Sequence, residues 1–360
     1  MSESSTCLSE SILWVMELSL GNSLVRKVLS HESFSWIHGD GIAAVLRSLL
    51  HTIIIVFWIN FRASRAFKLH STWSFASHIG MTRLPASLRL ISFVSLFHFG
   101  SLVLLFLSQS LLGNDLVSIR NVHRLENGAI DWYRLSESLI GSPIREELVF
   151  RAVLANVFYS RTEGLNPRTR FLYQCYGPAA LFGAVHLLNF ASASRAGYPL
   201  SYVSAQVTLG VLLGLFFCLS FVRSNTVLEP IILHFINNLS AMFVSRSDKF
   251  DLSNPWLFVP LSITFAFYSH FVKMIWNELY DSVSGEVDNF SDLIKARSHL
   301  KALQSDLESA SARERVRLSK QFEEAIESLY SQLTPDAAGE SRFRNQAVHA
   351  LIHQFKTHQA

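Results

Sequence analysis

The stretch GSPIREELVFRAVL, residues 141–154, decides how the chain folds, because it places ionisable side chains inside an apolar run. Glu146, Glu147 and Arg151 stand here between segments that are long and hydrophobic enough to lie in a membrane. An ionisable residue within a membrane span costs roughly 2.5 to 3.5 kcal/mol on insertion scales, and such residues face the protein interior with a partner. The stretch therefore predicts a functional site whose other members lie elsewhere in the chain.

The composition indicates a multi-pass integral membrane protein. Of the 360 residues, 49% are hydrophobic and 16% are charged, whereas soluble domains carry about 25% charged residues. The formal net charge is +3, from 31 basic and 28 acidic residues. Because the charges are so balanced, and no basic cluster is interleaved with aromatic residues, no nucleic-acid partner is predicted.

Apolar runs of about 17 to 25 residues mark the expected membrane spans. Such runs occur at 41–61, 88–113, 136–160, 176–193, 201–222, 228–244 and 255–276. Residues 11–30 form either a weaker additional span or an interfacial helix. We therefore predict an all-α fold, a polytopic membrane helix bundle of about seven or eight transmembrane helices. The membrane domain covers residues 41–276 and follows an N-terminal segment, residues 1–40.

Basic residues indicate which loops face the cytosol. The loops after the first and third clear spans hold Arg62, Arg65, Lys68, Arg161, Arg168 and Arg170. By the positive-inside rule these two loops are cytosolic, although the loop 114–135 also contains three arginines. This orientation places the C-terminal tail in the cytosol. The sequence does not indicate which membrane the protein occupies.

The C-terminal tail, residues 277–360, is polar and has the pattern of an amphipathic helix or a short helical hairpin. Apolar residues recur at three- and four-residue steps between charges from Leu300 to Leu333, and a second short helix is predicted at 342–358. We expect the tail to pack on the cytosolic face of the membrane domain or on itself. The alternative is a coiled coil that binds a protein partner.

The spacing of the charged residues in 141–154 predicts which of them share a helical face. Glu147 and Arg151 are four residues apart, so they share one face and are expected to pair. Glu146 is rotated by about 100° from Glu147 in a 3.6-residue repeat, which leaves its carboxylate free for proton transfer. In the alternative interpretation, all three charges lie at the end of a span near the lipid head groups.

Two other apolar spans carry polar groups. His186 lies in FGAVHLLNF, and His234 and Asn238 lie four apart on one helical face in HFINN. Each residue on its own fits a hydrogen bond between packed membrane helices. If Glu146, His186, His234 and Asn238 converge, they form a site able to polarise water and stabilise an oxyanion. His98 and His270 lack such companions, and we expect them to be structural.

These residues carry a resemblance to a known family. EELVFR (146–151), FGAVH (182–186) and HFINN (234–238) resemble the EExxxR, FxxxH and HxxxN motifs of the CPBP family of intramembrane proteases. That family includes the type II CAAX prenyl protease and abortive-infection proteins. The order and separation of the motifs also fit, over roughly residues 135–245. No matching motif occurs before residue 130 or in the tail.

The resemblance implies a role for each matching residue. Glu146 would activate the hydrolytic water, with His186 helping to hold it. His234 and Asn238 would stabilise the tetrahedral oxyanion. As structural support, Glu147 and Arg151 would form the ion pair and Phe182 would shape the cavity. The implied substrate is a peptide or a prenylated CAAX-type protein, cleaved in contact with membrane lipid.

The sequence leaves the cofactor open between none and zinc. Glu146, His186 and His234 have the nitrogen and oxygen donors that zinc accepts, with one position left for water. However, HExxH is absent, and a ligating Glu146 would not be free as the base. We therefore favour a metal-free site.

Two other functions remain compatible with buried Glu and His residues. A proton-coupled transporter also places such residues at mid-membrane, but it usually shows paired repeats or broken helices in both halves, and neither is found in this sequence. A non-catalytic membrane scaffold would tolerate loss of the motif residues, which are all present here. The sequence therefore favours the endopeptidase, a hydrolase acting on peptide bonds.

Overall fold

The computed structural model describes residues 3–31, 41–67, 75, 79–81, 85, 87–112, 125, 127–162, 165–188, 200–243 and 258–280, with eight separate residues between 302 and 324. Every element within these ranges is helical, as predicted. The chain divides into one unit of residues 1–163 with 170–275 and another of residues 164–169 with 276–360. The predicted site lies in the first unit. The tail helices and their protein partner remain predictions, because most of the tail lies outside the described residues.

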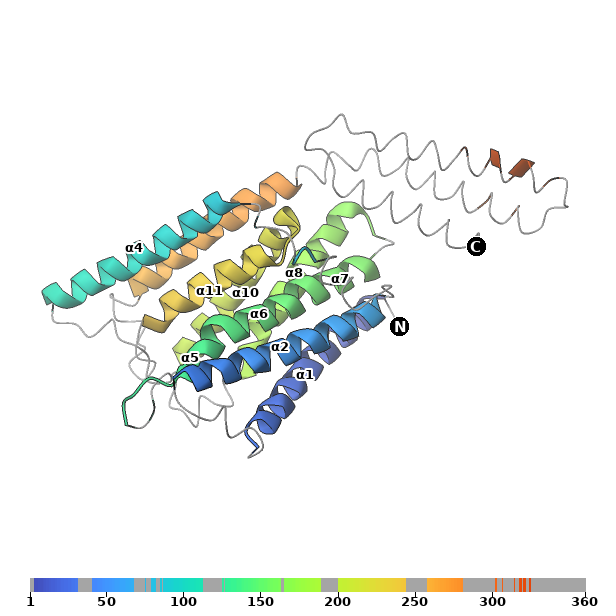
Figure 1. Ribbon diagram of the computed structural model, residues 1–360. Coiled ribbons are helices and arrows are strands. Elements are labelled where there is room, and N and C mark those ends of the chain that lie inside the picture. The colour runs from blue at the N-terminus through green and yellow to red at the C-terminus, as the bar shows by residue number, and fades with distance from the viewer. Residues whose placement is uncertain are drawn as a thin grey trace. The chain divides into compact units, whose positions relative to one another are not determined.

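The first unit consists mainly of long helices. They are α1 (Glu3–Leu29), α2 (Ile42–Ala66), α4 (Leu88–Leu112), α8 (Pro167–Val185), α10 (Leu200–Ser224) and α11 (Leu228–Phe243), with a further helix beginning at residue 258. Between α4 and α8 runs an unbroken helical segment, residues 132–161. Its middle part, α6 (Ser142–Glu147), lies between α2 and α11, with α1 beyond α2 and α4 beyond α11 (Figure 1).

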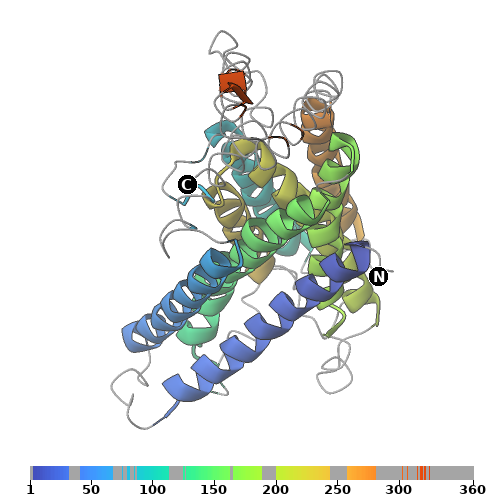
Figure 2. The same cartoon turned by 90° about the vertical axis from the view of Figure 1, so that its right-hand side faces the viewer.

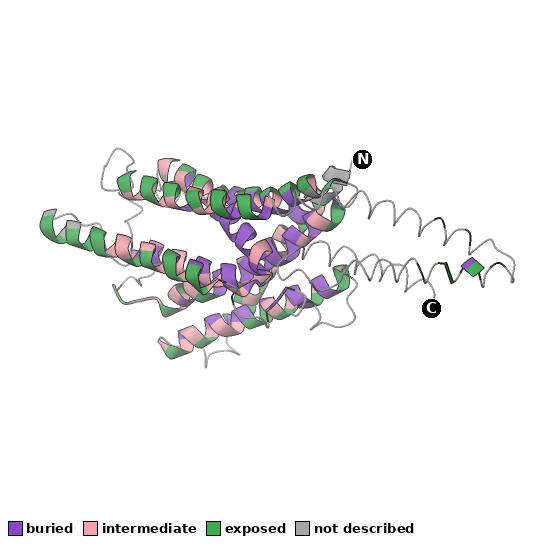
Figure 3. Cartoon of the chain, turned by 90° about the horizontal axis from the view of Figure 1, so that it is seen from above, coloured by how far each residue is buried: buried purple, intermediate pink, exposed green. Residues whose placement is uncertain are grey.

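Four of the described helices are long and apolar enough to cross a membrane. They are Ile42–Ala66, Leu88–Leu107, Val203–Ser224 and Phe258–Tyr280. Their outer faces carry large exposed hydrophobic residues, and the buried residues gather where the helices meet (Figure 3). The protein is thus an all-helical integral membrane protein. The other predicted spans fall on helices that are shorter or less apolar, so the total of seven or eight stays a prediction.

The buried face of α2 carries several polar side chains. Its buried residues recur every three or four positions and include Ser48, His51, Thr52, Ile55 and Ile59. The opposite face exposes isoleucines and phenylalanines. In lipid the apolar residues face outward and polar side chains must find partners within the protein. The polar half of the buried stripe therefore turns toward the segment 132–161.

The N-terminal helix α1 lies beside α2 (Figure 2). Two ion pairs hold it: Glu17 with Arg62 of α2 at 2.9 Å, and Glu10 with Arg161 at 2.9 Å. Glu10 and Glu17 are two helical turns apart, so Arg62 and Arg161 lie at the same end of the helices. On which side of the membrane the loops that follow them lie stays a prediction.

The 3.6-residue repeat expected around Glu146 and Glu147 is found in α6. The stretches on either side of α6 are wider π-helical turns, η3 (Glu137–Gly141) and η4 (Leu148–Leu154). Pro143 explains the first, because it has no N–H to donate and its ring displaces the preceding turn. Only α6 between them keeps the regular repeat. Glu146 and Glu147 both lie in α6, but their carboxylates are less separate than predicted, because each lies near one nitrogen of the His234 ring.

Candidate active site

The most deeply buried part of the site is an ion-paired group made of Glu147, Arg151 and His234. Glu147 and Arg151 are fully buried, and His234 is 5% exposed. One carboxylate oxygen of Glu147, Oε2, lies 2.9 Å from Arg151 Nε, and the other, Oε1, lies 2.7 Å from His234 Nδ1. The sequence predicts only the pair with Arg151. The structure shows that Glu147 also fixes the imidazole of α11.

This contact fixes which ring nitrogen of His234 faces the rest of the site. The carboxylate of Glu147 can only accept a hydrogen bond, so the hydrogen must lie on His234 Nδ1. The other nitrogen, Nε2, points toward Glu146 and lies 3.9 Å from its Oε2. A carboxylate that orients an imidazole in this way is a common support for catalytic and ligating histidines.

Aromatic rings enclose the Arg151 guanidinium. Its central carbon lies 4.5 Å from the ring centre of Phe182, 5.4 Å from that of Phe217 and 5.7 Å from that of Phe150. None of its nitrogens has a well-aligned hydrogen bond to the described residues, so the ring faces and the Glu147 charge compensate its burial. Phe182 also meets His186 and His234 edge to face, with centroids 5.4 and 5.9 Å apart. The motif phenylalanine therefore contacts both histidines.

Glu146 differs from its neighbour in exposure. Its side chain is 30% exposed, whereas that of Glu147 is fully buried. The hydroxyl of Ser142, one turn earlier on α6, donates a hydrogen bond to Glu146 Oε1. The second oxygen faces His234 Nε2. The structure thus provides an accessible carboxylate beside an oriented imidazole, which is an arrangement suited to general base catalysis.

His186 follows directly after the last residue of α8. It is close enough to Glu146 and His234 for an electrostatic interaction with both. Its imidazole packs against Gly210 of α10, where an added Cβ would lie 2.7 Å from His186 Cδ2. Gly210 also approaches the backbone of Gly183. The absence of a side chain at Gly210 therefore makes room for the His186 ring.

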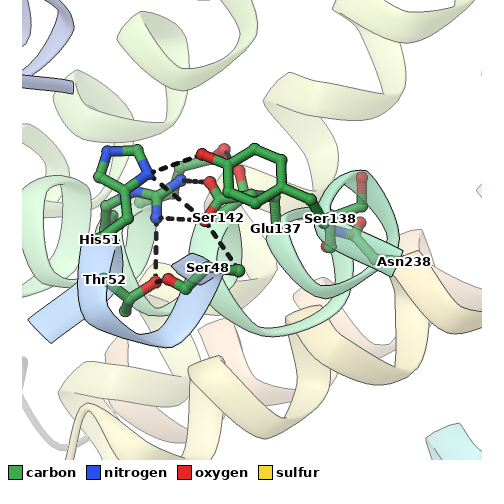
Figure 4. Close-up of polar contacts among 10 residues, drawn as sticks. Ser48, His51, Thr52, Glu137, Ser138, Ser142 and Asn238 are labelled. Atoms are coloured by element: carbon green, nitrogen blue, oxygen red, sulfur yellow. Dashed lines mark hydrogen bonds and ion pairs between the residues drawn. The ribbon is translucent and has the colours of Figure 1, made fainter. Parts of the chain in front are cut away.

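Asn238 lies one turn after His234 on α11. Its amide nitrogen donates a 2.9 Å hydrogen bond to the backbone carbonyl of Ser138, in the first π-helical turn (Figure 4). An asparagine amide has two hydrogens, so it can donate to a second acceptor as well. Glu146, His234 and Asn238 thus lie where α6 and α11 meet, and His186 comes from the end of α8 to interact with Glu146 and His234.

The sequence-based interpretation missed the polar residues that surround this centre. Ser138 and Ser142 contact Asn238 and Glu146, but single serines in an apolar run carry no distinctive signal. A second buried cluster contains Ser48, His51, Thr52, Tyr133, Glu137 and Arg145. The buried charges of Glu137 and Arg145 were the available signal, because each charged residue in a span requires a partner.

A metal site does not follow from the arrangement of these side chains. Among the described residues, no three His, Cys, Asp or Glu side chains are grouped closely enough to hold a metal ion. His234 Nδ1 is engaged by Glu147, so Nε2, 3.9 Å from Glu146 Oε2, is the nitrogen that could reach an ion, and no third described donor is grouped with these two. The residues Glu146, His186 and His234 thus do not form a ligand set as they stand.

Comparison with known proteins identifies the segment that carries this site. Residues 131–240 match the family described as type II CAAX prenyl endopeptidase, Rce1-like. This segment is similar to that family, and we call it the Rce1-like segment. The match confirms the resemblance based on the three motifs, and the matched family is one of proteases. No curated protein and no solved structure matches the chain. Helices α1, α2 and α4 lie outside the Rce1-like segment.

Proposed function

We propose that the protein is an intramembrane endopeptidase in which Glu146 activates water. One observation carries the proposal: the partly exposed carboxylate of Glu146 lies 3.9 Å from His234 Nε2, while His234 Nδ1 is held by buried Glu147. The remaining support comes from the Rce1-like match over residues 131–240. A buried ion pair alone does not require an accessible carboxylate next to it.

In the proposed reaction, Glu146 removes a proton from water as the water oxygen attacks the scissile carbonyl carbon. His186 helps to hold the water. The carbonyl oxygen becomes an oxyanion and accepts the remaining amide hydrogen of Asn238. The intermediate then collapses with cleavage of the C–N bond, and the proton held by Glu146 passes to the leaving nitrogen. Proton and oxygen atoms therefore balance with one water consumed.

The orientation of His234 places a condition on its proposed role. Because Nδ1 donates to Glu147, Nε2 of a neutral ring is an acceptor. His234 can therefore donate to the oxyanion only when both ring nitrogens carry hydrogen. The carboxylate of Glu147 would then balance the imidazolium charge. In its neutral form the same nitrogen would accept a hydrogen from the attacking water.

We further propose that the substrate is a prenylated CAAX-type protein, on the basis of the Rce1-like match. The test uses the purified full-length protein in lipid with three peptides of equal length: a farnesylated CAAX peptide, its unmodified counterpart and an unrelated transmembrane peptide. We expect release of the C-terminal tripeptide from the farnesylated peptide alone. Cleavage of the transmembrane peptide alone would contradict the substrate assignment, and no cleavage of any peptide would contradict the protease assignment for these substrates.

The proposed reaction uses no metal. The side chains of the site already provide a base, a group that holds water and an oxyanion donor, so the chemistry is complete without a ligand set. Zinc is the alternative cofactor, and the effect of a chelator on the cleavage rate distinguishes the metal-free reaction from the zinc-dependent one.

A further inference from the structure

A second buried cluster lies next to the site, on the other side of the first π-helical turn. Glu137 of this turn pairs with Arg145 of α6 at 2.5 Å, accepts a hydrogen bond from Ser48 of α2 at 2.9 Å and lies 3.5 Å from His51 Nδ1. Arg145 also donates to the hydroxyl of Thr52 at 3.1 Å. Figure 4 shows the labelled members converging between α2 and the turn. The cluster thus joins the Rce1-like segment to a helix outside it.

The cluster packs directly against the backbone of the turn. At Gly141, an added Cβ would lie 2.7 Å from Arg145 Nη1, 2.8 Å from Glu137 Oε1 and 2.8 Å from Thr52 Oγ1. A side chain at this position would therefore push the charged groups apart. The turn has a particular need for such support, because Pro143 cannot donate the backbone hydrogen bond that would otherwise continue the helix.

The same turn holds two groups of the proposed active site. The carbonyl of Ser138, next to Glu137, accepts the hydrogen bond from the Asn238 amide. The hydroxyl of Ser142, next to Gly141, donates to Glu146. Any shift of residues 137–142 would therefore move the oxyanion donor and the base relative to each other. Rates of enzymatic reactions are sensitive to such shifts, since about 1 Å of misplacement can cost about 10²-fold.

We propose that Glu137 and Arg145 are positioning residues, which fix the 137–142 backbone and thereby align Asn238 and Glu146 with one peptide bond. Ser142 transmits this placement to Glu146. The inference rests on the proposed endopeptidase function. It also assigns α2 a role in catalysis, because Ser48, His51 and Thr52 hold the pair from that helix.

The experiment changes both charges together, in Glu137→Gln with Arg145→Gln. The double change removes both charges, so neither is left buried without its partner. A single change would leave one such charge, which would by itself unfold part of the protein. We expect kcat for the farnesylated CAAX peptide to fall about 10- to 100-fold while KM stays within about twofold, as expected for lost alignment rather than lost binding. Purely structural support would leave kcat of the folded fraction unchanged.

Tyr268→Phe is the matched control. Tyr268 is buried and its hydroxyl lies 2.6 Å from Nε2 of the buried His98, in the pair formed by α4 and the helix that begins at residue 258. Loss of the Tyr268 hydroxyl should lower the stability of the protein without changing kcat. If this variant and the double variant lower kcat equally, the inference is wrong.

Ser142 provides a finer test. Ser142→Ala removes the hydroxyl that contacts Glu146, and Ser142→Thr keeps a hydroxyl at the same position. We expect Ser142→Ala to lower kcat and Ser142→Thr to restore most of it. Equal activity of the two variants would show that the contact with Glu146 does not position the carboxylate.

A measurement without substrate separates this inference from the proposed function. Ile53 on α2 and Ile140 in the turn are 63% and 37% exposed, so cysteines there accept spin labels. Cys7 is changed to serine, since the other two cysteines are buried. We expect one narrow distance distribution in the otherwise native chain and a broader one with both Gln changes. An unchanged distance distribution in the double variant would overturn the inference. If the native chain cleaves no peptide, the proposed function fails instead.

Discussion

Two groups each pair a glutamate and an arginine of the segment 132–161 with a histidine from another helix, and they differ in which of their atoms stay accessible. Glu147, with Arg151 and His234, forms one group, and Glu137, with Arg145 and His51, forms the other. In the first, the free imidazole nitrogen faces a carboxylate that is 30% exposed. In the second, His51 Nε2 is buried and has no hydrogen-bond partner among the described residues. A buried ion pair alone therefore does not indicate a catalytic site. A catalytic site also requires an accessible reacting group beside the pair.

The largest expected effect concerns Glu146. Glu146→Gln keeps the size and one hydrogen-bond acceptor of the side chain but removes the base, so kcat should fall by about 10² to 10⁴ with little change in thermal stability. The measurement is the cleavage rate in lipid together with the unfolding temperature. Retention of near-native kcat would show that the accessible carboxylate is not what distinguishes the two groups.

The two groups should behave alike when each loses its arginine. Arg151→Ala and Arg145→Ala each leave a buried glutamate without its cation, which costs about 3 to 5 kcal/mol of unfolding free energy. Arg62→Ala, at the partly exposed pair with Glu17, should cost about 0 to 1 kcal/mol. Unfolding in detergent checks all three. Equal stability of Arg151→Ala and Glu146→Gln would contradict the separation between structural support and chemistry.

Asn238 lies one turn after the histidine of the first group and tests the proposed contact with the oxyanion. Asn238→Ala removes the amide donor, and each such donor is worth about 10² to 10³ in kcat. The rate should fall by that factor, with KM changed less. Asn237→Ala, one residue earlier, is the control, because within the described part of the chain Asn237 makes a single weak contact, 3.5 Å long, to Asn238. Similar losses in both variants would argue for a general disturbance of α11.

A smaller effect is expected at Gly210. The added methyl group of Gly210→Ala would meet the His186 ring at 2.7 Å and displace it, which should lower kcat about tenfold. Gly100→Ala on α4 is the matched control, because beyond its own helical turn no described residue lies within 4 Å of the added Cβ there. Native activity of Gly210→Ala would remove His186 from the proposed water-holding role.

The smallest effect is expected from removing metal. On the metal-free proposal a chelator leaves the cleavage rate unchanged, and His234→Asn retains measurable activity because it keeps a donor while offering zinc a poor ligand. Activity and bound metal are measured on the same purified sample. Loss of activity that excess zinc restores would instead support zinc held by Glu146, His186 and His234.

The sequence predicted the helices and the motif residues but not the geometry that connects them. Periodic apolar runs and the three motifs located α2, α4, α10, α11 and the paired Glu147 and Arg151. The π-helical turns were missed because periodicity assumes one repeat, and Pro143 was the only local sign of a change. Glu137 and Arg145 are eight residues apart and His51 lies on a distant span, so no spacing rule joins them. Only packing shows that they share one turn.

The most direct test of the account follows the oxygen that enters the product. The purified protein in lipid cleaves the farnesylated CAAX peptide in water labelled with ¹⁸O, and the mass of the new C-terminus is measured during the first turnover. Glu146-activated attack predicts one labelled oxygen in the new carboxyl group, and no product from Glu146→Gln on the same time scale. Full product formation by Glu146→Gln, or a product without labelled oxygen, would contradict the account.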